Sequence, residues 1–159
     1  MIIEFNLNEK AVNINVPPQK RLVDILREEF NLFSIHHECG EGLCGRCTIL
    51  MNDKLTYSCL IPAFKAKGKN VATYEWFQES EGYQDITKGF KYAGCYPCRH
   101  CESTRMLAAH TLLETSFRPS QEEIANFMSF ITCGCIDFTT LFSGLIEAGR
   151  IREERVHER

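Results

Sequence analysis

Eight of the nine cysteines in this 159-residue chain fall into two sets of four, each confined to its own half of the sequence. The first set follows the spacing C-x4-C-x2-C with a fourth cysteine further on, and consists of Cys39, Cys44, Cys47 and Cys59. The second set combines C-x2-C with a later C-x-C, and consists of Cys98, Cys101, Cys133 and Cys135. Two sets with different internal spacing predict two separate sites, about one small domain apart.

The spacing of the first set is that of plant-type ferredoxins, in which four thiolates hold a 2Fe–2S cluster. The second set is open between an iron–sulfur cluster and a zinc ion, because its four cysteines could also make a tetrahedral thiolate site. Disulfides fit poorly, since the cysteine count is odd and no export signal is visible. The ninth cysteine, Cys95, is expected to be a small buried hydrophobic residue.

The composition of the chain excludes some classes of binding partner from the prediction. The net charge of −3 comes without any basic stripe, so no nucleic-acid binding is expected. No apolar run approaches the roughly 18 residues that would span a bilayer, so no membrane association is expected. The first ten residues lack the basic and apolar regions of a signal peptide. We therefore expect a cytoplasmic protein in a reducing compartment, where cysteines serve metal or redox chemistry.

The first half, residues 1–76, alternates apolar and polar positions in short stretches that predict strands. Residues 21–30 place apolar side chains at helical spacing instead, so one amphipathic helix is expected there. The strands are expected at 2–7, 11–16, 48–51, 55–57 and 71–74. The order of elements predicts a small mixed-sheet, ferredoxin-like (β-grasp) domain, with the cysteine loop between helix and strand.

Strand patterns end after this first domain. Residues 77–85 are polar and are expected to be a linker, and residues 150–159 are mostly charged and are expected to be a solvated tail. Between them, residues 86–149 predict a four-helix domain, with helices expected at 86–93, 104–115, 120–130 and 137–148. The last helix is expected to stop at Gly149. The fold class is therefore predicted to be α+β.

The second cysteine set flanks helix ends in this prediction. Helix amino termini direct N–H groups and positive dipole toward what lies there, which suits an anionic four-thiolate cluster. This placement favours iron–sulfur chemistry over zinc for the second set. In the first set, Gly40, Gly42 and Gly45 let the backbone wrap closely, so that its N–H groups reach the cluster sulfurs.

The run C-G-x-G-x-C-G-x-C-T at 39–48, Ser58-Cys59 and the segment 71–75 resemble the amino-terminal ferredoxin-like domain of the xanthine dehydrogenase and aldehyde oxidoreductase family. The resemblance continues through Cys98-x2-Cys101 and Cys133-x-Cys135 and covers nearly the whole chain. It implies a small two-cluster subunit of a molybdenum hydroxylase. It also implies a partner subunit with FAD and a large catalytic partner with molybdopterin, the second cysteine set holding the cluster nearer the molybdenum.

The chain departs from the family pattern around the second set only. Pro97 stands where the family has glutamine, and Cys101-Glu102-Ser103-Thr104-Arg105 stands where it has C-T-P-G-M. Residues 130–138 differ likewise from G-N-L-C-R-C-T-G-Y. Neutral drift is one explanation of these departures. The other hypothesis is that the surface facing the molybdenum cofactor has changed to suit another partner or an unusually bound cofactor.

The predicted function is one-electron transfer through two 2Fe–2S clusters between a flavin subunit and a substrate-transforming subunit of an oxidoreductase complex. The sequence offers no catalytic nucleophile or base. Two alternatives stay open. One is the same relay in a complex whose large subunit is not a molybdenum hydroxylase, and the other is a zinc-stabilised interaction module without a redox role.

Overall fold

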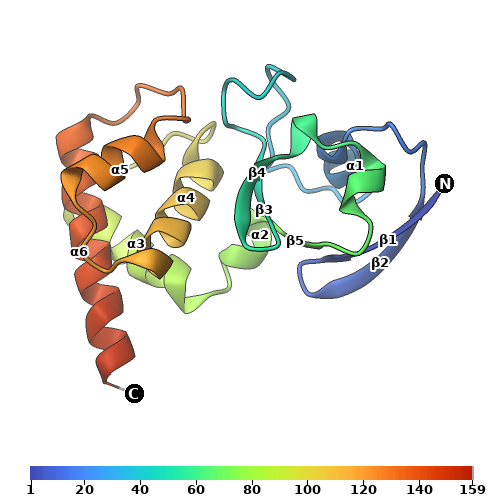
Figure 1. The fold of residues 1–159 in the computed structure, drawn as a ribbon. Helices are drawn as coiled ribbons and strands as arrows, with labels where there is room; N and C mark the ends of the chain where they lie inside the picture. Colours follow the sequence, from blue (N-terminus) through green and yellow to red (C-terminus); the bar gives the residue numbers. More distant parts are fainter. Residues whose placement is uncertain (159) are drawn as a thin grey trace.

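The computed structural model describes residues 1–158, which form two parts lying side by side (Figure 1). The amino-terminal part is a five-stranded sheet with a helix packed against it, and the carboxy-terminal part is built of helices. This arrangement confirms the predicted α+β class, with a ferredoxin-like domain followed by a four-helix domain.

The sheet has the strand order β2-β1-β5-β3-β4. Its strands are β1 (Ile2–Leu7), β2 (Lys10–Asn15), β3 (Thr48–Met51), β4 (Lys54–Tyr57) and β5 (Asn70–Ala72). β1–β2 and β3–β4 are hairpins, and each turns through two consecutive residues with positive φ, Asn8-Glu9 and Asn52-Asp53. Such pairs are typical of the tight turns whose twist matches that of the flanking strands. β5 then enters the middle of the sheet, parallel to β1 and antiparallel to β3.

The core of the ferredoxin-like domain lies between this sheet and α1 (Leu22–Glu28). Ile3 and Phe5 on β1 face the fully buried Leu22, Ile25 and Leu26 of the helix, as the alternation and the helical spacing predict. The chain then passes through the short turns η1 (Ser58–Leu60) and η2 (Ala63–Ala66) before β5. A one-turn helix, α2 (Tyr74–Phe77), ends the domain.

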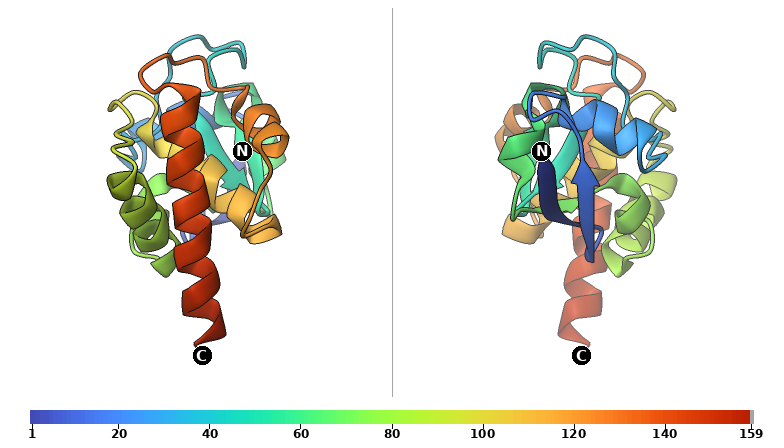
Figure 2. Two further views of the ribbon diagram at one scale, coloured as in Figure 1. Left: turned by 90° about the vertical axis from the view of Figure 1, so that its left-hand side faces the viewer. Right: turned by 90° about the vertical axis from the view of Figure 1, so that its right-hand side faces the viewer.

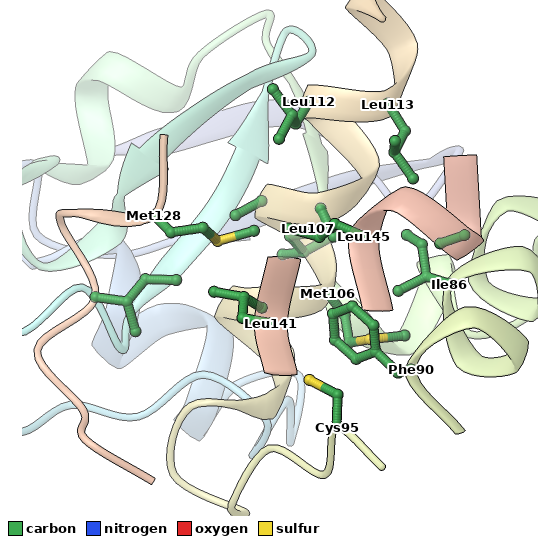
Figure 3. Close-up of a cluster of buried hydrophobic side chains, with 14 of the residues drawn as sticks. Ile86, Phe90, Cys95, Met106, Leu107, Leu112, Leu113, Met128, Leu141 and Leu145 are labelled. Carbon is green, nitrogen blue, oxygen red and sulfur yellow. The ribbon is translucent and has the colours of Figure 1, made fainter. Parts of the chain in front are cut away.

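The second domain consists of α3 (Glu81–Tyr92), α4 (Glu102–Thr115), α5 (Gln121–Met128) and α6 (Phe138–His157). Figure 3 shows its core, to which α4 contributes Leu107 and Leu113 and α6 contributes Leu141 and Leu145. Gly89 of α3 allows close packing against α6, because a Cβ there would lie 2.4 Å from the backbone nitrogen of Ala148. Cys95 lies in this core at 1% exposure, as expected of a buried hydrophobic residue.

Side chains cap the starts of two helices. Ser120 and Glu123 form a capping box at α5. The Asp137 side chain accepts the backbone N–H of Thr140 at the start of α6.

Two predictions for the carboxy-terminal residues are wrong: that the last helix ends at Gly149, and that residues 150–159 are a solvated tail. α6 runs through Gly149 to His157, so residues 150–157 are helical. Arg152 is 2% exposed and pairs with Asp85 and Glu114, and Arg155 pairs with Asp85 and Glu81. These contacts join α6 to α3 and α4, and they supply the long-range partners that a charged helix end needs in order to pack.

The expected linker at 77–85 also holds more structure than predicted. Phe77 is fully buried, and α3 begins at Glu81, with the Ser80 side chain accepting the backbone N–H of Tyr83. Among residues 1–158, no helix is both long enough and apolar enough to cross a membrane.

Candidate metal centre

The first cysteine loop, residues 39–47, lies between α1 and β3. Gly40, Gly42 and Gly45 all have positive φ, near 70°, a conformation that side chains disfavour. The loop directs the backbone N–H groups of Glu41, Leu43 and Cys44 at the Cys39 sulfur, at 3.4 to 3.5 Å. These donors, Glu41 foremost, lower the pKa of Cys39 to about 6 and so favour its thiolate. The loop is therefore shaped to hold a negatively charged sulfur.

Cys47 and Cys59 form the buried side of the same set. Cys47 precedes β3 and Cys59 lies in η1, and the β3–β4 hairpin brings the two together at 2% and 3% exposure. Burial raises the pKa of Cys47 to about 12. The four sulfur atoms of the first set do not all lie within 4.8 Å of one another.

The second set is gathered more tightly, since all four sulfur atoms lie within 4.8 Å of one another. Cys98 lies 3.7 Å from Cys101 and 3.6 Å from Cys133, and Cys101 lies 3.4 Å from Cys135. Cys101 occupies the N-cap of α4, and Cys133 and Cys135 lie between α5 and α6. The placement at helix starts agrees with the sequence analysis.

The charge state of Cys98 also favours metal binding. Partial burial acts to raise its pKa, but hydrogen bonds from the backbone of His100 and from the neighbouring cysteines outweigh burial and lower the pKa to about 7. Thiolate, not thiol, is the form that binds metal.

Both cysteine sets lie at the same end of the molecule. Figure 2 shows the 39–47 loop (light blue to cyan) beside the 129–137 segment (orange), at the end opposite the carboxy terminus. The Thr132 hydroxyl donates to the Cys44 carbonyl at 3.4 Å, and the Thr104 hydroxyl donates to the Gly45 carbonyl at 3.0 Å. Thr132 directly precedes Cys133, so its side chain connects the segment of the second cysteine set to the backbone of a cysteine in the first set.

Histidines reinforce this junction. His36 Nε2 lies 3.0 Å from the Arg99 carbonyl, and His100 lies 3.4 Å from the Glu38 carboxylate, which also pairs with Arg46. One ligand-capable atom each of His36, Glu38 and His100 lies within 4.8 Å of the others. Their meeting across the domain boundary carries no sequence signal, because it depends on how the two domains dock.

Three of the residues that depart from the family pattern are not on the surface. Ser103, Thr104 and Arg105 are 5%, 0% and 4% exposed. The Ser103 hydroxyl donates to the Ser34 carbonyl at 2.9 Å, Thr104 donates to Gly45, and Arg105 contacts the cysteines. The hypothesis of a rewritten partner surface is therefore wrong for these three positions, which instead build the domain junction and line the second cysteine set.

The two cysteine sets can bind a metal group whose ligands are thiolates. Two groups of four cysteines, with backbone N–H donors around Cys39 and a buried arginine beside Cys101, match the ligands and hydrogen bonds of 2Fe–2S sites. For the second set, the sulfur separations also suit Zn²⁺, which holds four thiolates about 3.8 Å apart at bond lengths of about 2.3 Å.

Comparison with known proteins bears on the family of the chain and on the first cysteine set. Residues 5–71 match the model of the 2Fe-2S iron-sulfur cluster binding domain. The chain is 34% identical to the nicotinate dehydrogenase small FeS subunit of Eubacterium barkeri over 143 residues, covering 90% of this chain and 91% of that subunit. It is 30% identical to a probable xanthine dehydrogenase subunit of Bacillus subtilis, covering 94% of this chain and 84% of that one.

A solved structure agrees along the entire chain. A chain of quinoline 2-oxidoreductase from Pseudomonas putida 86 superposes with a TM-score of 0.87 at 28% identity, covering 100% of this chain and 98% of that chain. The resemblance seen in the cysteine motifs thus extends to sequence and fold over nearly the full length. The chain belongs to the family of small iron–sulfur subunits of the xanthine dehydrogenase and aldehyde oxidoreductase type, the molybdenum hydroxylases, and binds a 2Fe–2S cluster.

Proposed function

We propose that this subunit relays single electrons through two 2Fe–2S clusters. The first cluster is held by Cys39, Cys44, Cys47 and Cys59. The second cluster is held by Cys98, Cys101, Cys133 and Cys135. The observation that carries the proposal is the junction between the cysteine sets, where Thr132 donates to the carbonyl of Cys44. Single electrons pass between redox centres that lie close together, and this junction holds the two cysteine sets next to each other.

The chain's own residues bind and shield the clusters. Backbone N–H groups around Cys39 stabilise sulfur charge, and the burial of Cys47, Cys59 and Cys101 keeps water away from part of each site. When bound, a 2Fe–2S cluster accepts and releases one electron. We nominate no catalytic residue on this chain.

The proposed partners are a flavin-binding subunit and a large catalytic subunit that carries molybdopterin. The family of small subunits to which the chain belongs supports this proposal. Native co-purification followed by assays for flavin, molybdenum and pterin tests it. A stable native complex whose large subunit lacks molybdenum would instead favour the same relay in another kind of oxidoreductase.

The test of the relay uses the full chain loaded with iron and sulfide under anaerobic conditions. We expect about four irons per chain and two EPR species after reduction with dithionite. Cys44→Ser should remove or alter one species, and Cys133→Ser should remove or alter the other. Cys95→Ser is the matched control, and it should leave both species in place because Cys95 lies in the hydrophobic core.

The sulfur separations of the second set favour one further candidate, a structural Zn²⁺ in the helical domain. Metal analysis of the native protein separates the two proposals. One zinc and two irons per chain, with a single EPR species that survives Cys133→Ser, would contradict the two-cluster relay.

A further inference from the structure

Arg105 is a buried cation in contact with the second cysteine set. Its side chain belongs to the first turns of α4 and the residue is 4% exposed. Its Nε donates to the Cys101 sulfur at 3.4 Å, and its Nη2 donates to the Cys133 carbonyl at 2.7 Å. The guanidinium therefore binds both halves of the second set, one at the start of α4 and one in the segment before α6.

Arg105 is not paired with a carboxylate, the usual partner of a buried arginine, within residues 1–158. The similarly buried Arg152, by contrast, pairs with Asp85 and Glu114. A buried charge is costly unless it is paired and hydrogen-bonded. The anionic partner available to Arg105 is the thiolate of Cys101, together with whatever negative group the four cysteines hold.

We propose that Arg105 raises the reduction potential of the 2Fe–2S cluster held by the second cysteine set. The inference rests on the proposed function, because it requires a cluster at this site. With Arg105 beside it, this cluster is a better electron acceptor than it would be with its four cysteine ligands alone.

Electrostatics gives the direction. Reduction adds one electron, here supplied by dithionite, and thus one negative charge to the site, with no bond broken. A fixed positive charge beside a ligand sulfur stabilises the reduced state more than the oxidised state, and so does a hydrogen bond to that sulfur. Arginine side chains carry a positive charge, and the burial of Arg105 limits screening of that charge by salt.

The experiment is an EPR-monitored redox titration of the cluster-loaded full chain. Arg105→Met keeps a long stem and removes the charge. We expect it to lower the reduction equilibrium constant of one EPR species by at least about tenfold, which is about 59 mV for one electron. The species that Cys44→Ser alters should move less. Arg105→Lys, which keeps the charge, should retain most of the wild-type potential.

Arg99→Met is the matched control. Arg99 lies between Cys98 and Cys101 but is exposed, so removal of its charge should shift the same species much less. A midpoint unchanged in Arg105→Met, or one shifted equally in Arg99→Met, would overturn the inference. If Arg105→Met does not retain the cluster, Arg105→Gln replaces it, with a lowered midpoint supporting the inference and an unchanged one overturning it.

The failure of this inference differs from the failure of the proposed function. A wild-type protein with only one EPR species contradicts the two-cluster relay itself. Two EPR species whose reduction potentials do not change when Arg105 is replaced contradict only the role assigned to this arginine.

Discussion

At the scale of single residues, Gly45 is where the first cysteine loop meets the second domain most closely. Its φ is +73°, and a Cβ there would lie 2.7 Å from the Phe130 carbonyl oxygen. In Gly45→Ala, the left-handed backbone costs about 1–2 kcal/mol and the clash with Phe130 adds about 1–3 kcal/mol. We expect thermal unfolding of the cluster-loaded chain at a midpoint several degrees lower.

Gly68→Ala separates the two contributions. Gly68 has nearly the same φ, +67°, but a Cβ there would meet nothing within 4 Å. This variant should lose only the backbone part, roughly 2–8 °C in midpoint at about 2–4 °C per kcal/mol. Equal midpoints for the two variants would mean that the contact with Phe130 contributes nothing to stability.

At the scale of elements, the last two turns of α6 are held by charge. Asp85 of α3 is 2% exposed and lies 3.5 Å from Arg152 and 2.7 Å from Arg155. Asp85→Ala leaves the buried Arg152 with one carboxylate partner, Glu114, which is mostly exposed. Removal of one partner from a buried pair costs about 3–5 kcal/mol, so chemical denaturation should show a large loss of stability.

The control for this network is an exposed ion pair between α6 and Arg118, which lies in the segment before α5. Arg118 pairs with Glu153 at 2.8 Å, but its side chain is 79% exposed. Arg118→Ala should cost at most about 1 kcal/mol. A comparable loss in the two variants would show that burial does not set the strength of the Asp85 network.

His110 makes the same region sensitive to acid. Burial, and then the positive charge of Arg152, lower its pKa below the ordinary value of 6.5 despite the nearby Glu114. The unfolded chain therefore binds the proton more readily, so stability rises with pH through this range and is lost on acidification below about 6.5. Between about pH 7 and about pH 5, His110→Gln should lose less unfolding free energy than wild type. A steeper loss in the variant would contradict this assignment.

The outcome of the sequence analysis differs between elements for a physical reason. The hairpins, α1 and the capping box at Ser120 follow from local alternation, helical spacing and short-range hydrogen bonds, and all were predictable. The end of α6 was not, because Arg152 and Arg155 find their partner about 70 residues away, at Asp85. Arg105 was likewise interpreted as a surface residue, because only the docking of two cysteine segments around it makes a buried cation tolerable.

At the scale of the whole molecule, the two domains share a core. Leu50 of the sheet belongs to the same buried cluster as Leu107 and Leu112 of α4, and Tyr74 and Phe77 of α2 join it from the boundary. The hydrogen bonds of Ser103, Thr104 and Thr132 then fix the domains next to the cysteine loops. The interface is thus an extension of the helical core, and we expect it to hold the two cysteine sets at a constant separation.

A shared core predicts that the two domains unfold together. Trp76, the single tryptophan, packs partly buried against the helical core at the domain boundary and reports on this interface. In urea, under anaerobic conditions, Trp76 fluorescence and far-UV circular dichroism should follow one transition with the same midpoint. Thr104→Val removes the buried hydrogen bond to Gly45, whose carbonyl keeps the Thr48 hydroxyl as a donor. Both midpoints should therefore shift down together by an amount set by about 0.5–1.5 kcal/mol. If fluorescence instead changed at lower urea than circular dichroism, the domains would separate before they unfold, and the distance between the two cysteine sets would not be fixed by the fold.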